Sequence, residues 1–349
     1  MATGLAFPQA PVRCVGCMPA AGGVCLPESI GTGMILLILG RVAGLALTLL
    51  SVSFLLFIVM GLLPGDPASI MLGTSASPDT LAALQKALGL DQPLLLRYLH
   101  WLGRVIGGDF GQSNTYGVPV SDLILERLSV TLPLALIAIG LSVLIGVPSG
   151  MAAASRPRGI IDVICGLFSQ ASLAIPGFWV GILLILWVSS GLHWLPAGGF
   201  PGWQAGLMPA LSALILPSVS LALAQAGVLA RVSRSAMLEV LEEDFIRTLR
   251  AKGLGEQTIL WRHVLPNALV PVVTMVGLQL TFLVAGAVLV ENVFNLPGLG
   301  RLAYQALTQR DLIVMQSVVL FFCTFVITAN FLVDLLYLVI DPRLRQAAK

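Results

Sequence analysis

The chain has 349 residues, of which 57% are hydrophobic and only 10% are charged, with a mean hydropathy of +0.95. Soluble domains carry about 25% charged residues, so this composition excludes a soluble globular protein and indicates a polytopic membrane protein surrounded by lipid. The net charge of +2 gives no reason to expect a nucleic-acid partner. Five scattered cysteines do not form a disulfide framework.

Residues 1–33 differ from the rest in being rich in Gly, Ala and Pro, with only Arg13 and Glu28 charged. We expect a disordered leader or an overlong start, because Met34 stands directly before the apolar run ILLILGR. Cys14 and Cys17 have the spacing of zinc ligands, but no second such pair and no histidine lies near them. We therefore expect no metal site.

Six uncharged runs are long enough, at about 20 residues each, to cross a bilayer as helices. They are Val42 to about Leu63, Val130–Ala154, Val163 to about Ser190, Leu211–Ala230, Leu269–Val290 and Leu312–Val333. The runs lack the alternation of barrel strands, so the predicted fold class is an all-α polytopic membrane protein with six transmembrane helices. Pro176, Gly177 and Pro217 are expected to kink their helices.

The division of the chain follows from these runs. The first helix spans 34–63, a large extracytoplasmic loop spans 64–127, five further helices span 128–341, and a cytoplasmic tail spans 342–349. Within the loop, ASPDTLAALQKALGL and PLLLRYLHWLGRVIG have the spacing of short amphipathic helices.

The orientation is predicted from the 19 Lys and Arg residues, which divide 13 against 6 between the two sides. Positive charge gathers on the cytoplasmic side. Both termini and the segment Leu238–Ala268 are therefore expected on the cytoplasmic side of the membrane.

The sequence contains no source of energy for transport. None of the three lysines follows a glycine, so there is no phosphate-binding loop, and no nucleophile–base pair suggests an enzyme. Ion-coupled carriers bury charged groups near mid-membrane, whereas Asp162, Glu291 and Asp334 fall at span ends. Gln225, Gln279 and Asn330 lie inside spans and fit either hydrogen bonds between helices or a hydrated route.

The segment Leu238–Ala268 is densely charged and lies between two apolar spans. Its leucine and phenylalanine side chains recur every three or four residues, which predicts one amphipathic helix with a stripe at Leu238, Leu241, Phe245 and Leu249. Gly253 is the expected stop, and Pro266 fits the first turn of the next span. A membrane-surface helix is the alternative, disfavoured by the near balance of acids and bases.

Gly253, followed twelve and thirteen residues later by Leu265 and Pro266, resembles the EAA loop of type I ABC-transporter permeases. The EAA triplet itself is replaced by Arg247, Thr248 and Leu249. The variant RTLRAKGL with HVLPNA behind it is similar to the dipeptide/oligopeptide/nickel permease family. Further matching segments occur in order: LLPGDPA (62–68), LGLDQPLLLRY (88–98), GDFGQS (108–113), ENVFNLPGLGRL (291–302) and VDLLYLVIDPRLR (333–345).

The resemblance implies a permease subunit of an ATP-binding-cassette importer for short peptides, or for nickel chelates, glutathione or another small solute. Residues 128–341 would be its type-1 transmembrane core, with a coupling loop at about 238–266. The implied partners are a second homologous permease chain, one or two cytoplasmic ATPase chains that bind ATP and Mg, and an extracytoplasmic binding protein. No cofactor is expected in this chain.

The same resemblance implies roles for the coupling loop. The apolar side chains expected in the ATPase groove are Phe245, Ile246 and Leu249. The polar side chains expected at its rim are Asp244, Arg247, Arg250 and Lys252, where charge adds specificity more than affinity. Gly253 would let the turn pass close to the partner.

A secondary carrier and a non-transporting scaffold that recruits an enzyme are the two rival functions.

Overall fold

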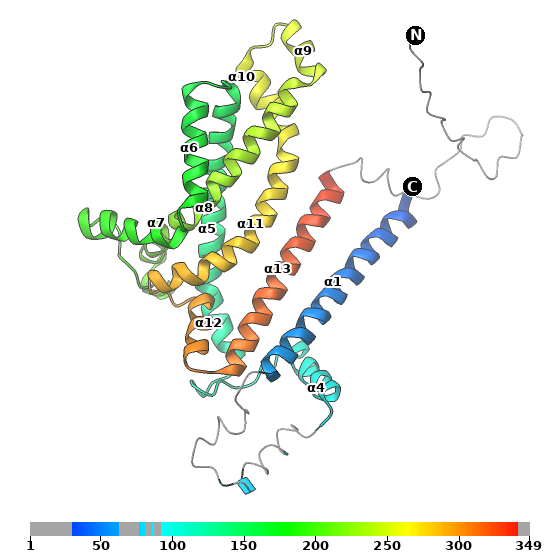
Figure 1. The fold of residues 1–349 in the computed structure, drawn as a ribbon, viewed down its shortest axis with the longest axis vertical. Helices are drawn as coiled ribbons and strands as arrows, with labels where there is room; N and C mark the ends of the chain where they lie inside the picture. Colours follow the sequence, from blue (N-terminus) through cyan, green and yellow to red (C-terminus); the bar gives the residue numbers. More distant parts are fainter. Residues whose placement is uncertain (1–29, 63–76, 78, 81–85, 87–91, 341–349) are drawn as a thin grey trace, which may run out of the picture.

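The computed structural model describes residues 30–62, 77, 79–80, 86 and 92–340 (Figure 1). These residues form helices, with one isolated bridge between Gln112 and Pro119. The expected all-α fold is confirmed. Residues 1–29 of the expected leader, the tail, most of the first loop helix, and the Cys14 and Cys17 pair lie outside the described residues. The last four residues assigned to the leader, 30–33, belong to the first helix instead.

The described helices range from 3 to 36 residues, and most of the long ones extend beyond the uncharged runs. In chain order they are α1 (Ile30–Leu62), α4 (Leu94–Ile106), α5 (Val120–Ser155), α6 (Ile160–Ala174), α7 (Gly177–Leu184), the π-helix η1 (Ile185–Gly191), the 3-10 helix η2 (Trp203–Ala205), α8 (Leu207–Glu242), α9 (Asp244–Ala251), α10 (Glu256–Ile259), the π-helix η3 (Leu260–Val264), α11 (Leu265–Val293), α12 (Leu299–Thr308) and α13 (Leu312–Ile340).

Five of the described helical stretches are long and apolar enough to cross a membrane, and a sixth crossing exists if α6 and α7–η1 form one span. The helices α1, α5, α8, α11 and α13 confirm five of the six predicted runs, and α4 confirms the second loop helix. α8 continues unbroken through Pro217.

The third run is not one kinked helix, because the axis turns by 101° between α6 and α7 (Figure 1). Ile175, which precedes Pro176, has extended backbone angles (φ −97°, ψ 121°). A residue before proline disfavours the helical region, and Pro176 has no N–H to donate back into α6. The kink expected at Pro176 is therefore a complete break.

Glycines bring α5 and α8 into backbone contact. A Cβ atom at Gly150 would lie 2.5 Å from the carbonyl oxygen of Ala230, and one at Gly146 would lie 2.7 Å from that of Ala226. Residues four apart share one helix face, so Gly146 and Gly150 form a small-xxx-small surface on α5. This pair was not predicted as a packing surface, although its four-residue spacing is visible in the sequence.

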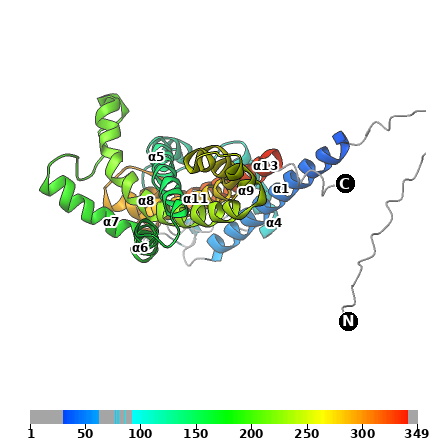
Figure 2. The same cartoon turned by 90° about the horizontal axis from the view of Figure 1, so that it is seen from above.

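Different short helices form the two ends of the molecule. α9 and α10 lie at one end, and α4 and α12 at the other; α1 begins and α13 ends toward the α9–α10 end (Figure 1). Seen from above, α1 lies at the edge of the bundle (Figure 2). Only 6% of the most apolar stretch of α1 is buried, so most of this helix is free to face lipid.

The close packing of α5 against α8 can be tested by measuring the stability of glycine variants. We expect Gly150→Val to destabilise the fold by about 1–3 kcal/mol, because added carbon must push α8 away. Gly140→Val is the matched control, since a Cβ at Gly140 on the same helix would meet nothing within 4 Å. Thermal unfolding of the purified protein in detergent measures both, and equal losses in the two variants would contradict the packing argument.

Candidate coupling hairpin and intramembrane polar groups

The charged segment folds as a hairpin of two helices rather than as one amphipathic helix. α8 ends at Glu242, Glu243 has extended angles (φ −66°, ψ 146°), and α9 begins at Asp244. Consecutive acidic side chains are unfavourable at a helix C-terminus and favourable at an N-terminus, so the acids stabilise a new start at this position. The predicted continuous stripe from Leu238 to Leu249 is therefore wrong.

The hairpin is held by an apolar core of its own chain. Ile246 and Ile259 are 0% exposed and pack with Met237 of α8 and Val264 of η3. Leu249 is partly buried against the same core. Ile246 thus has no surface to offer a partner in this conformation, contrary to its expected place in an ATPase groove.

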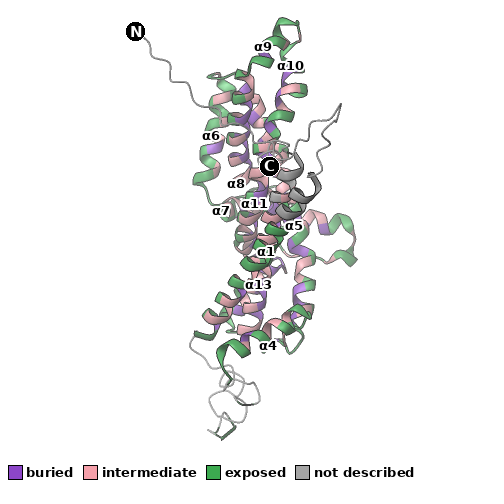
Figure 3. Cartoon of the chain, turned by 90° about the vertical axis from the view of Figure 1, so that its right-hand side faces the viewer, coloured by how far each residue is buried: buried purple, intermediate pink, exposed green. Residues whose placement is uncertain are grey.

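The outward face of the hairpin carries one large apolar side chain among charges. Phe245 is 42% exposed. Exposed, charged residues lie on the same hairpin, and Figure 3 shows in green that much of its α9–α10 end is exposed. The charged residues are Asp244, Arg247, Arg250, Lys252 and Glu256. An apolar centre inside a polar rim is the usual composition of a protein-binding surface.

Two ion pairs order this rim. Asp244 accepts a hydrogen bond from Arg247 at 3.2 Å, with both side chains strongly exposed. Arg250 donates two hydrogen bonds to Glu256, at 2.8 and 3.2 Å, which tie α9 to α10. The Glu256 carboxylate raises the pKa of the Arg250 guanidinium through these bonds. Exposed pairs contribute little stability, so their main effect here is to fix the positions of the charges.

Gly253 makes the turn between the two helices. Its φ of +79° lies in the left-handed region, as expected for a helix stop. Its N–H donates to the Arg250 carbonyl at 2.9 Å, and the N–H of Leu254 donates to the Leu249 carbonyl at 3.3 Å. A Cβ at Gly253 would meet nothing within 4 Å, so the strain of a substitution here comes from the backbone and not from a clash within the chain.

Trp261 is a surface residue that sequence analysis missed. It lies on η3 and is 56% exposed, whereas Leu260 and Val264 beside it are buried. The available signal was an aromatic residue next to Arg262 near the start of a span, a position where tryptophan is common at the membrane surface.

The three polar residues inside the spans do not form one group. The Gln279 side chain is 0% exposed, and its Nε2 donates to the Gln225 carbonyl oxygen of α8 at 3.2 Å. Gln279 therefore joins α11 to α8. The Gln225 and Asn330 side chains are half-buried, and within the described residues no hydrogen bond links either side chain to Gln279.

Glu291 has a role that its place at a span end did not reveal. It is 0% exposed and accepts hydrogen bonds from Thr131 at 2.7 Å and from the Arg301 N–H at 3.0 Å. A Cβ at Gly298 would lie 2.2 Å from the carboxyl carbon, so this glycine leaves the space that the carboxylate occupies. The carboxylate joins α5, α11 and α12. The described residues contain no group of three His, Cys, Asp or Glu able to hold a metal ion.

Comparison with known proteins places this architecture in a family. Residues 146–346 match the family described as "Binding-protein-dependent transport system inner membrane component", and residues 34–135 match its N-terminal counterpart. A putative peptide transport system permease protein of Brucella abortus (strain 2308) is 43% identical over 314 residues, covering 89% of this chain and 99% of the relative. The glutathione transport system permease protein GsiC of Salmonella typhimurium is 41% identical over 308 residues, covering 88% and 98%.

A solved structure has a similar fold. A chain of the MetNI methionine ABC transporter, described as inward facing, has a TM-score of 0.50 and 22% identity, over 65% of this chain and 96% of that one. Three observations point to the same family: the helical bundle, the family match that includes the hairpin, and the near-complete coverage of the relatives. The chain belongs to the binding-protein-dependent transport family and is a type I ABC importer permease, a multi-pass protein of the inner membrane.

Proposed function

We propose that this chain and a second homologous permease chain form the membrane pathway of an importer for short peptides. The relatives named as peptide permeases and as a glutathione permease support this substrate class, since glutathione is itself a small peptide. A nickel chelate or another small solute is the alternative. Uptake of labelled di- and tripeptides into proteoliposomes, with glutathione and nickel chelates as competitors, tests the assignment.

We further propose that one or two cytoplasmic ATPase chains bind ATP and Mg and dock on the outward face of the hairpin, and that an extracytoplasmic binding protein delivers the substrate. This chain holds no cofactor in the proposal. The main support for ATPase docking is the structure of the hairpin. Ile246 is fixed in the apolar core of the hairpin. Phe245 and the ion pairs Asp244–Arg247 and Arg250–Glu256 are exposed and available to a partner.

The hairpin is built to transmit motion. α8 enters it directly and runs 36 residues through the bundle, so a displacement of α9 moves a long helix. The Gln279 hydrogen bond couples α11, which leaves the hairpin, to the same helix. We propose that ATP-driven closure of the ATPases moves α8 and α11 together, and that Gln225 and Asn330 contribute to the hydrated route.

The proposed orientation places the hairpin and both chain termini in the cytoplasm. We expect Asn114→Cys, on the exposed loop at the α4 end, to react with an impermeant maleimide in intact cells. Thr258→Cys, exposed on α10, should react only after permeabilisation. Asn114 serves better than its neighbour Ser113, which is buried. The reverse labelling pattern would overturn the orientation.

The turn at Gly253 generates a test of coupling. We expect Gly253→Val to insert normally and to lose stimulation of ATP hydrolysis by ligand-loaded binding protein, because a β-branched residue resists a φ of +79°. Gly255→Val is the matched control, since Gly255 has φ −69° and also has open space around it. The ATPase rates of reconstituted complexes measure both. Full stimulation in the Gly253 variant would contradict the coupling role.

Substitutions at the neighbouring residues Phe245 and Ile246 distinguish an effect on ATPase docking from an effect on stability. Phe245→Ala should weaken ATPase binding by about 1–2 kcal/mol, at most about thirtyfold, with little change in the unfolding temperature. Ile246→Ala should destabilise the hairpin core by about 2–5 kcal/mol. Pull-down of the ATPase and thermal unfolding distinguish the two. Unchanged ATPase binding by a folded Phe245→Ala variant would remove Phe245 from the docking surface.

A further inference from the structure

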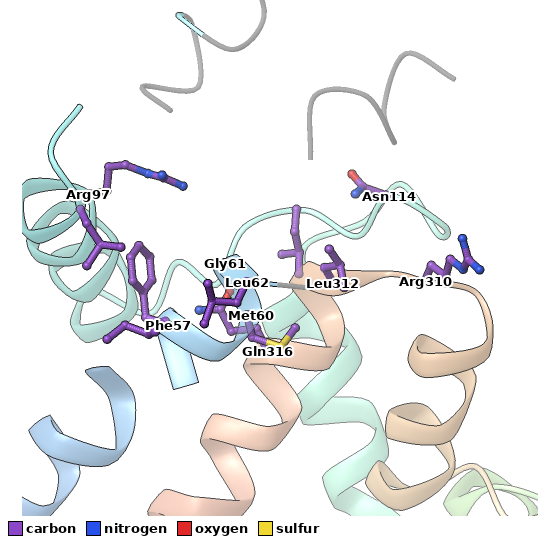
Figure 4. Close-up of a pocket in the computed structure, with 12 residues that line it drawn as sticks. Phe57, Met60, Gly61, Leu62, Arg97, Asn114, Arg310, Leu312 and Gln316 are labelled. Atoms are coloured by element: carbon purple, nitrogen blue, oxygen red, sulfur yellow. The ribbon is translucent and has the colours of Figure 1, made fainter. Parts of the chain in front are cut away.

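A cavity of about 200 Å³, drawn in Figure 4, lies at the α4 end of the molecule, opposite the hairpin (Figure 1). It lies between the end of α1, the start of α4, the loop that contains Asn114 and the start of α13. Phe57, Met60 and Leu312 form an apolar floor, and Arg97 and Arg310 lie on opposite sides of it, as Figure 4 shows.

The polar side chains that line this cavity are two arginines, Arg97 and Arg310, and two amides, Asn114 and Gln316, and none of the described lining residues is Asp or Glu. Within the described part of the chain, no ion pair engages either arginine. The Nε2 atom of Gln316 is buried and has no hydrogen-bond partner. Two guanidinium groups without an acidic partner among the described residues make the cavity electropositive, and the unsatisfied amide N–H offers a further donor, so the cavity is suited to an anionic ligand.

The wall that carries Arg97 is fixed by its neighbour Tyr98. The Tyr98 hydroxyl lies 2.8 Å from the Ser53 hydroxyl and donates to the Leu50 carbonyl at 3.2 Å, so α4 is held on α1 by buried polar contacts. The Tyr98 ring also packs edge-on against Phe54, with centroids 5.0 Å apart. These contacts place the Arg97 side chain beside the cavity.

The opposite wall is fixed by Asp311. This carboxylate is 1% exposed and accepts hydrogen bonds from the Ser113 hydroxyl at 2.6 Å and from the Thr115 N–H at 3.1 Å. Asn114 lies between those two donors, and Arg310 precedes Asp311. Each polar rim residue therefore stands next to a buried anchor, which is how a preorganised site is built.

Arg310 also occupies a costly backbone position. Its φ is +56°, in the left-handed region where glycine is the favoured residue. It closes the C-terminal end of α12, where its N–H donates to the Leu307 carbonyl at 3.3 Å. Glycine would adopt this turn with less strain, so an arginine side chain at this position has a backbone cost.

We propose that this cavity binds the phosphate of an anionic phospholipid, with the acyl chains lying along α1. The cavity is at the ends of two spanning helices, where headgroups lie, and α1 is almost unburied along its apolar length. Leu95 and Leu99 on α4 are 61% and 52% exposed, as in a helix that lies in the membrane surface. Arginine stems cover apolar surface while their guanidinium groups reach a phosphate.

The experiment compares lipid retention by the full chain in its purified complex. We expect wild type to retain phosphatidylglycerol through purification, measured by mass spectrometry of extracted lipid. Arg97→Gln and Arg310→Gln should each reduce retention about fivefold, which corresponds to roughly 1 kcal/mol for each arginine. Arg104→Gln removes the same charge from the exposed end of α4, away from the cavity, and should retain lipid as wild type does.

Arg310→Gly separates ligand binding from folding. It should lose lipid as Arg310→Gln does, yet unfold at the same or a higher temperature in neutral-lipid nanodiscs, because glycine relieves the turn. Phosphatidylglycerol should raise the unfolding temperature of wild type, whereas inorganic phosphate and glycerol phosphate should not.

Three results would overturn the proposal. The first is equal lipid loss in Arg104→Gln, which would reduce the effect to general surface charge. The second is equal protection by inorganic phosphate, which would make the ligand a free anion. The third is a result in which Arg97→Gln retains lipid as wild type does but loses the stimulation of ATP hydrolysis by binding protein. In that case the cavity would bind an acidic surface of the binding protein instead of a lipid.

Discussion

The contact between α5 and α8 is the constraint on which the rest of the structure depends. Lipid tails are as apolar as leucine side chains, so helices in a membrane gain little from the hydrophobic effect and associate through close packing. Gly146 and Gly150 provide that packing by removing the side chains that would separate the two backbones. Gly227 extends the arrangement, since a Cβ there would lie 2.3 Å from Ser172 of α6, and the Ser169 hydroxyl donates to its carbonyl at 2.6 Å.

Once α8 is fixed in this way, it organises both the helices packed around it and the hairpin. It contacts four helices, α5, α6, α7 and α11. Arg234, in the half of α8 that is cytoplasmic in the proposed orientation, donates two hydrogen bonds to Asp162 of α6. The hairpin core is built partly from α8 residues such as Met237. A force applied at α9 would therefore act on a helix that packs against four others, α5, α6, α7 and α11.

Buried and exposed polar groups have different roles in this molecule. Glu291, Asp311 and Tyr98 are buried, and their hydrogen bonds position the turns of the end opposite the hairpin. The charges that remain exposed or half-buried, at the hairpin and at the rim of the cavity, are free to meet other molecules. A buried polar group that lost its partner would be costly, so these anchors give the exposed charges defined positions.

Sequence alone determined the features that depend on local chemistry. Five spanning helices follow from the length of apolar runs, and the left-handed turn follows from Gly253, because both depend only on neighbouring residues. The tertiary structure decided which side of a short helix is buried. Ile246 points inward because α8 and η3 supply a core for it, and the break at Glu243 lets it do so. The pairing of Glu291 with Thr131, and of Asp311 with Ser113, joins residues 160 and 198 positions apart, and no local pattern encodes such distances.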